Sequence, residues 1–109
     1  MAEFNVPDRV VEAVVAFLDA GAELSRLSAA QPRPTEVAAG TAVLTDEQRA
    51  QWQAAFAEER RLGEVVREDP WWAEVEPGRR IAAEVHVRNL AKAAQSQRDG
   101  QAPSAGNSV

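Results

Sequence analysis

Proline placement constrains this chain most strongly, because its six prolines leave three segments that are each long enough for a helix of several turns. Proline inside a helix removes a backbone hydrogen bond and clashes with the preceding turn. Helices are therefore expected to end near Pro32 and Pro34, and again near Pro70 and Pro77. Pro7 suits the first position of a helix, where its missing N–H costs nothing. Together with the helical spacing of the apolar residues between the prolines, this pattern predicts an all-α fold.

The expected fold is a small bundle of three main helices, with a short fourth helical turn between the second and third. A chain of 109 residues allows one small domain with a modest core. We expect a single helical domain over residues 1–98, with helices over about 7–30, 45–67 and 79–97. Residues 99–109 have the composition of a flexible, disordered tail.

The first predicted helix is apolar over more than half of its circumference. At 100° per residue, its charged side chains fall within a narrow arc, and valine, leucine, phenylalanine and alanine occupy most of the rest. Two neighbouring helices shelter such a surface only with difficulty, whereas an oligomer covers it more easily. Val10, Val15 and Leu24 are therefore candidate partner-binding residues on this wide apolar face.

The second predicted helix begins with the clearest local signal in the sequence. Thr45 and Gln48 have the spacing of a capping box, in which each side chain bonds the backbone N–H of the other residue. The connection before it, from Gln31 to Leu44, is longer than a usual helix–helix loop and favours extended backbone at its prolines. Helical spacing predicts a core made of Val11, Val14, Phe17, Leu18, Trp52, Phe56, Leu62, Val66, Val87 and Leu90.

The second break holds a pair of adjacent tryptophans. Asp69 and Pro70 resemble a helix cap followed by a first-turn proline, which predicts a short helical turn over Trp71 to Glu74. Tryptophan often dominates binding surfaces, so Trp71 and Trp72 are a second set of candidate partner-binding residues. An alternative, equally open for this pair, places one indole in the core and the other at the surface. Alanine content favours a helix after the break over a hairpin at Pro77-Gly78.

Composition excludes several classes of site. The chain has no cysteine and one histidine, which removes disulfides, thiolate chemistry and multi-histidine metal centres, and we expect neither a cofactor nor a metal. The net charge of -5 argues against general binding to nucleic acid or anionic membranes. The longest apolar run, residues 13–18, is far shorter than a membrane span. We expect a cytoplasmic protein with no targeting segment.

Glu59 and His86 form the one candidate catalytic pair. Glu59 lies within the apolar arc of the second predicted helix, where an isolated carboxylate is costly to bury. His86 lies within the apolar arc of the third predicted helix. If these helices are antiparallel neighbours, the two side chains meet as an acid–base pair. The alternative is a structural polar contact, or a glutamate that reaches solvent at the edge of the core.

The third predicted helix is basic while the rest of the chain is acidic. Residues 78–109 carry 5 basic and 2 acidic side chains, whereas residues 1–77 carry 7 basic and 15 acidic ones. This pattern permits a nucleic-acid contact through Arg79, Arg80, Arg88 and Lys92. Attraction to the acidic first two helices, within the chain or between subunits, is the favoured explanation, because Glu84 interrupts the basic stripe.

These patterns favour a non-enzymatic helical module for protein–protein interaction. It would be a small adaptor or assembly subunit that self-associates or binds a protein partner, through the wide face of its first helix and the tryptophan turn. A small nucleic-acid-associated regulator and a small enzyme or accessory subunit built on Glu59 and His86 are the two alternatives.

Overall fold

The computed structural model describes residues 4–101, and every regular element in this range is helical. The elements are α1 (Asp8–Ala30), α2 (Pro34–Ala38), α3 (Asp46–Glu68), the 3₁₀ helices η1 (Pro70–Glu74) and η2 (Pro77–Arg79), and α4 (Arg80–Gln101). The predicted all-α fold with three main helices and a short helical turn is confirmed. The predicted tail lies mostly outside the described residues, and α4 extends into its first part, 99–101.

Local capping rules set the helix boundaries. At the start of α3, the Thr45 Oγ1 accepts a hydrogen bond from the Gln48 backbone N–H at 3.0 Å, and the Thr45 N–H donates to Gln48 Oε1 at 2.9 Å. The predicted capping box is therefore confirmed. The Asp69 side chain accepts from the Trp71 backbone N–H at 2.9 Å, which begins η1 just before Pro70. The turn is a five-residue 3₁₀ helix, a form that is common in short connectors between helices.

The connection between α1 and α3 is more ordered than the sequence predicts. Pro34 opens the five-residue helix α2, because proline is suited to a first helical turn as well as to extended backbone. The Arg33 backbone N–H donates to Glu36 Oε1 at 3.0 Å and so satisfies one free donor at this helix start. Gly40 then turns the chain with a φ of +79°, a left-handed conformation that glycine adopts without strain.

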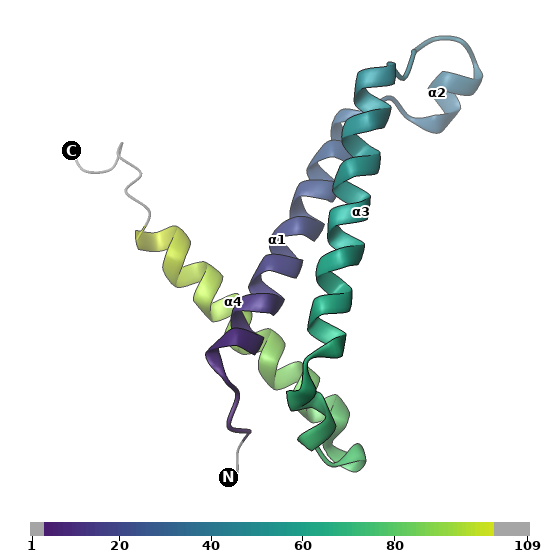
Figure 1. Ribbon diagram of the computed structural model, residues 1–109. Coiled ribbons are helices and arrows are strands. Elements are labelled where there is room, and N and C mark those ends of the chain that lie inside the picture. Colours follow the sequence, from purple (N-terminus) through teal and green to yellow (C-terminus); the bar gives the residue numbers. More distant parts are fainter. Residues whose placement is uncertain (1–3, 102–109) are drawn as a thin grey trace, which may run out of the picture.

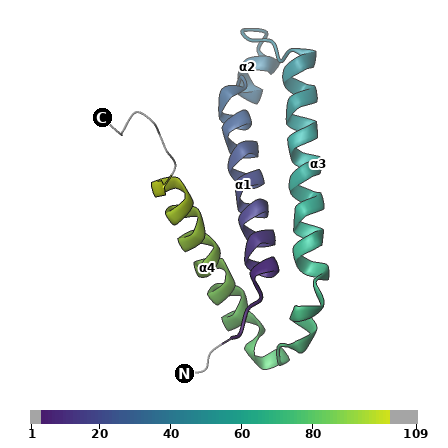
Figure 2. The same ribbon diagram turned by 60° about the vertical axis from the view of Figure 1, so that its left-hand side comes forward.

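The three long helices form one flat layer in which α1 lies between α3 and α4 (Figures 1 and 2). Helix α3 runs antiparallel to α1 along its whole length, and α4 returns beside the other flank of α1 while leaning away from α3 (Figure 2). The molecule measures 57 × 45 × 19 Å. Its radius of gyration is 18.3 Å, whereas a compact domain of this length has about 13 Å. A single layer of helices leaves much of its surface uncovered.

The core lies at the end of the layer where α3 passes through η1 into α4. Its buried apolar residues within the described part are Val10, Val14, Trp71, Trp72, Ala83, Val87 and Ala91. Val14 and Val87 were predicted core residues and are confirmed.

Three predicted core residues lie elsewhere. Trp52 is only half-buried, and Phe56 and Leu90 are 38% and 37% exposed. Trp52 and Phe56 stack on each other, with ring centroids 5.1 Å apart, in the half of α3 nearer α2. Only α1 lies beside α3 there, so the prediction of a core around these two rings was wrong. Leu90 flanks the face that α4 turns toward α1 and remains at the surface.

Two glycines mark where α1 and α3 approach each other. A Cβ added at Gly63 would lie 3.1 Å from Cε1 of the Phe17 ring, so this glycine allows the ring to approach the α3 backbone. A Cβ added at Gly21 would meet the Glu59 Oε2 at 3.2 Å, which is the free end of a flexible side chain. The Phe17 ring at Gly63 can therefore move aside less easily than the Glu59 side chain at Gly21.

Replacing Gly21 with alanine is expected to raise the free energy of unfolding by about 0.5–1 kcal/mol, because alanine restricts the unfolded chain and favours helix. The Glu59 carboxylate can rotate away from the added methyl group. Urea denaturation of Gly21→Ala checks this prediction. Gly63→Ala is the matched control, because its added methyl group meets the Phe17 ring. Equal stabilisation by both variants would show that the Phe17 contact offers no resistance.

Candidate functional site

The tryptophan turn, η1, is the junction of the fold and lines two of its pockets. The rings of Trp71 and Trp72 pack edge to face, with centroids 4.9 Å apart and planes at 72°. Both indoles are buried. Trp71 lines one pocket and Trp72 lines another. Adjacent residues of a tight turn point to different sides, which explains how one short helix supplies a wall to both pockets.

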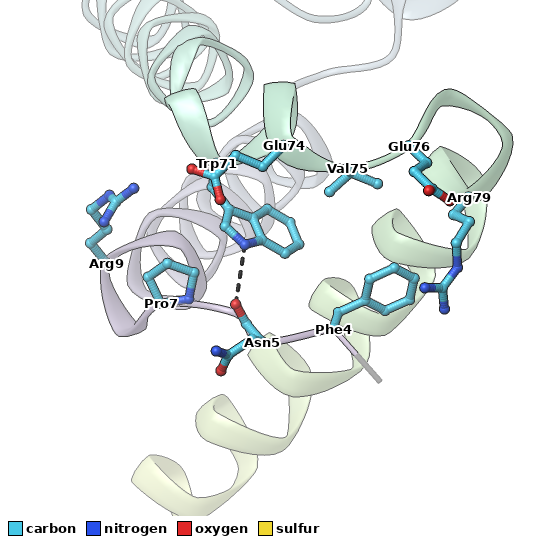
Figure 3. Close-up of a pocket in the computed structure, with 9 residues that line it drawn as sticks. All are labelled: Phe4, Asn5, Pro7, Arg9, Trp71, Glu74, Val75, Glu76 and Arg79. Carbon is cyan, nitrogen blue, oxygen red and sulfur yellow. Dashed lines mark hydrogen bonds between the residues drawn. The ribbon is translucent and has the colours of Figure 1, made fainter. Parts of the chain in front are cut away.

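The first pocket, here the Trp71 pocket, lies between η1, η2 and the segment before α1 (Figure 3). Its volume is about 570 Å³, and it is open to solvent. The Trp71 Nε1–H donates to the backbone oxygen of Asn5 at 3.1 Å, and the Arg79 guanidinium lies 4.3 Å from the centre of the Phe4 ring. The lining residues are Phe4, Asn5, Pro7, Arg9, Trp71, Glu74, Val75, Glu76 and Arg79.

An ion pair between distant parts of the chain fixes this pocket. Arg9 of α1 makes two hydrogen bonds of 2.9 Å to Asp69, the residue that caps η1. The Arg9 hydrogen bonds, with the Trp71 backbone N–H, hold the pKa of the Asp69 carboxyl below its ordinary value. A second long-range pair joins Asp19 of α1 to Arg98 of α4 at 2.7 Å, and this pair lowers the pKa of Asp19. Together these pairs tie α1 to η1 and to α4.

Acidification is expected to destabilise the fold in the range from about pH 5 to about pH 3. A carboxylate whose pKa is lower in the folded protein contributes stability above its unfolded pKa. That contribution is lost as the pH falls through the lower folded value. The loss is modest because Asp19 and Asp69 form exposed pairs. Thermal unfolding measured across this range checks the direction.

The variants Asp69→Asn and Asp19→Asn separate the two contributions. Asparagine keeps an oxygen that can cap η1 but does not ionise, so each variant is expected to unfold with less pH dependence than the original chain. Glu36→Gln, in the short helix α2, serves as a control because Glu36 forms no ion pair within the described residues. Unchanged pH dependence in both aspartate variants would contradict the assignment.

The second pocket, here the arginine pocket, lies between α1, α3 and α4 beside Trp72. Its volume is about 160 Å³. Valine, leucine, phenylalanine and tryptophan side chains supply the apolar part of its lining, and three arginines and one glutamate supply the charged part. The lining residues are Val14, Phe17, Leu18, Val66, Arg67, Trp72, Arg80, Glu84, Val87 and Arg88.

Comparison with known families gives one match. A family described as a domain of unknown function, DUF8825, matches residues 9–90. The chain belongs to this family. No curated protein and no solved structure matches the chain. The DUF8825 region contains every residue of the arginine pocket, whereas the Trp71 pocket also uses Phe4, Asn5 and Pro7, which precede it.

The DUF8825 fold keeps Glu59 and His86 apart. Glu59 lies half-buried over Gly21 of α1, and His86 packs against Phe4 with ring centroids 5.6 Å apart. The condition for this pair, that the two helices are neighbours, is not met, because α1 lies between α3 and α4 (Figure 2). The absence of a side chain at Gly21 leaves room for the Glu59 carboxylate at the edge of the core. This arrangement offers no acid–base pair.

The basic residues of the DUF8825 chain have different surroundings. Arg79 covers Phe4, and Arg80 lies 4.8 Å from the centre of the Trp72 ring while pairing with Glu84 at 3.0 Å. Arg88 and Lys92 are exposed on α4. Two of the four candidate phosphate-binding side chains therefore cover aromatic rings of their own chain, and the nucleic-acid interface stays an untested prediction.

The candidate partner-binding residues are only partly available at the DUF8825 surface. Val10 is 1% exposed, and Trp71 and Trp72 are 7% exposed each, so these three side chains belong to the core. The sequence left two alternatives open for the tryptophans: both on a partner surface, or one in the core and one at the surface. In the structure both indoles are buried. Val15 and Leu24 are half-buried and remain accessible from one side.

Sequence reasoning missed the arginine pocket and the pairing of Arg9 with Asp69. Asp69 was recognised as a cap from its position before Pro70, but nothing local indicates that Arg9, sixty residues earlier, meets it. Arg67 of α3 lines the arginine pocket. Arg61, on the same helix, pairs with Glu58 at 2.8 Å. Within residues 4–101, no helix has the length and apolar character needed to cross a membrane.

Proposed function

We propose that this protein is a non-enzymatic helical interaction module that self-associates through the apolar surface of α1. The carrying observation is that α1, although flanked by two helices, buries only Val10 and Val14. Its remaining large apolar side chains are half-buried: Val11, Val15, Phe17, Leu18, Leu24 and Leu27. The flat layer therefore leaves the central helix uncovered, as the width of its apolar arc predicts.

One set of these residues is suited to pairing with another helix. Five half-buried residues, here the α1 stripe, recur every three or four positions and lie within about 80° on the helix surface. They are Ala13, Ala16, Ala20, Leu24 and Leu27. Alanines at this spacing let a second helix approach closely, and the leucines supply apolar area at one end.

A second copy of the chain is the partner that this surface favours. A two-fold interface places the same surface patch of both subunits in contact. The α1 stripe contains no charged residue, so the net charge of -5 is not concentrated at the contact. Stacking two copies face to face would also give the half-buried side chains of α1 a second packing layer, as in an ordinary domain.

Sedimentation equilibrium of the full chain at micromolar concentration tests the proposal. We expect a dimer or larger oligomer for the original chain and a monomer for Ala20→Glu, which places a charge within the α1 stripe. Ala22→Glu is the matched control, because Ala22 is exposed on the same helix and lies outside the stripe. Circular dichroism confirms that both variants fold, and Leu27→Glu replaces Ala20→Glu if the latter does not.

Two results would overturn self-association. One is a monomer for the original chain throughout the concentration range. The other is identical association of Ala20→Glu and Ala22→Glu, which would place the interface elsewhere on the molecule.

A further inference from the structure

The arginine pocket combines an apolar floor with a cationic rim. Val14, Phe17 and Leu18 of α1 line it together with Val66 of α3 and Val87 of α4. A small apolar group enters such a space favourably because it leaves water. The floor comes from three helices, so the pocket exists only in the folded chain.

The rim of the pocket carries three arginines and only one acidic side chain. Arg67, Arg80 and Arg88 face a single carboxylate, Glu84, which pairs with Arg80 at 3.0 Å. Within residues 4–100, neither Arg67 nor Arg88 has a carboxylate oxygen within 4.0 Å of its guanidinium. In a chain of net charge -5, this gathering of arginines is a local reversal of sign. A guanidinium binds a carboxylate through two parallel hydrogen bonds, which makes a carboxylate the matching ligand group.

Trp72, which lines the pocket, also carries a hydrogen-bond donor without an acceptor among the described residues. The Trp72 Nε1–H is buried and has no partner among the described residues. A buried unpaired donor is costly, so this indole gains from any acceptor that reaches it. Arg80 lies over the same ring, 4.8 Å from its centre. A ligand bound in the pocket would therefore lie beside this ring, so the indole N–H can report its binding.

We infer that the arginine pocket binds a small organic anion, namely a carboxylate carried on an apolar group of about six carbons. A cavity of about 150 Å³ holds one benzene-sized group, and the pocket measures about 160 Å³. The apolar group lies on the valine, leucine and phenylalanine floor, and the carboxylate meets Arg67 and Arg88 at the rim. This inference rests on the residues of the pocket and does not require self-association.

Titration of the ¹⁵N-labelled full chain with hexanoate tests the inference. The Trp72 indole N–H signal, assigned by its loss in Trp72→Phe, is expected to shift and to saturate. Acetate lacks the apolar group, hexan-1-ol lacks the charge, and hexylamine reverses it, so each is expected to bind at least about tenfold more weakly. Equal binding of hexan-1-ol and hexanoate would show a purely apolar pocket and overturn the inference.

Arginine variants locate the anion. The double variant Arg67→Gln/Arg88→Gln is expected to weaken hexanoate binding by at least about tenfold while binding of hexan-1-ol stays the same. Arg61→Gln is the matched control, since Arg61 lies on α3 outside the pocket. If the double variant does not fold, the single variant Arg88→Gln, at an exposed position, replaces it. Absence of a saturable shift, or equal weakening by Arg61→Gln, would overturn the inference.

Discussion

Replacing Trp71 with alanine is expected to lower the free energy of unfolding by about 3–5 kcal/mol, the range for truncating a buried large aromatic side chain. The core of the described chain contains only seven buried apolar residues, and two of them are the adjacent indoles of η1. Truncation removes the edge-to-face contact with Trp72 and the hydrogen bond from Nε1 to Asn5. A domain has about 5–15 kcal/mol of stability in total, so this variant approaches unfolding.

Trp52→Ala is the control, because it removes the same side chain from a half-buried position. Its ring stacks on the exposed Phe56, and its Nε1–H donates to Ser28 Oγ at 2.9 Å near the surface. Urea denaturation at constant temperature measures both losses. If Trp52→Ala lowers the free energy of unfolding as much as Trp71→Ala does, the core lies in the half of the α1–α3 pair nearer α2 and not at η1.

The helices and their ends were predictable from sequence because they depend on neighbouring residues. The capping box of Thr45 and Gln48 and the cap at Asp69 are short-range hydrogen bonds, and proline excludes the helix interior wherever it occurs. The core position was not predictable in the same way. Helical spacing identifies the apolar arc of α3 but not which part of its length a third helix covers. Because α4 leans away from α3, the half of α3 nearer α2, which contains Trp52 and Phe56, has only α1 beside it (Figure 2).

The pockets were beyond sequence reasoning for a related reason. Arg67 and Arg88 belong to different helices, and each has the pattern of an ordinary surface charge on its own helix. Their convergence depends on α1 lying between α3 and α4, and no local pattern determines that order. The same order separates Glu59 from His86. The wide apolar arc of α1, in contrast, follows from its own residues. Of the three side chains expected to be available on it, Val15 and Leu24 are half-buried and Val10 is buried.

Replacing Ala91 with leucine is expected to cost about 1–3 kcal/mol, because the contact between α1 and α4 has no room for a larger side chain. Ala83, Val87 and Ala91 recur every four residues along α4 and are at most 1% exposed. Small side chains at two of these positions allow α4 to lie close to α1. A leucine at Ala91 forces the helices apart and separates Asp19 from Arg98, which lies about two turns further along α4.

Ala93→Leu separates this steric effect from a general effect of leucine on the helix. Ala93 is exposed on α4, so the same substitution there is expected to change stability by less than about 0.5 kcal/mol. Hydrogen exchange then distinguishes local from global opening: in Ala91→Leu, the α4 amides lose protection before those of α1 and α3, because α4 contacts α3 very little. Simultaneous loss across all three helices would instead mean that the layer unfolds as one unit, with the α1–α3 pair dependent on α4 for its stability.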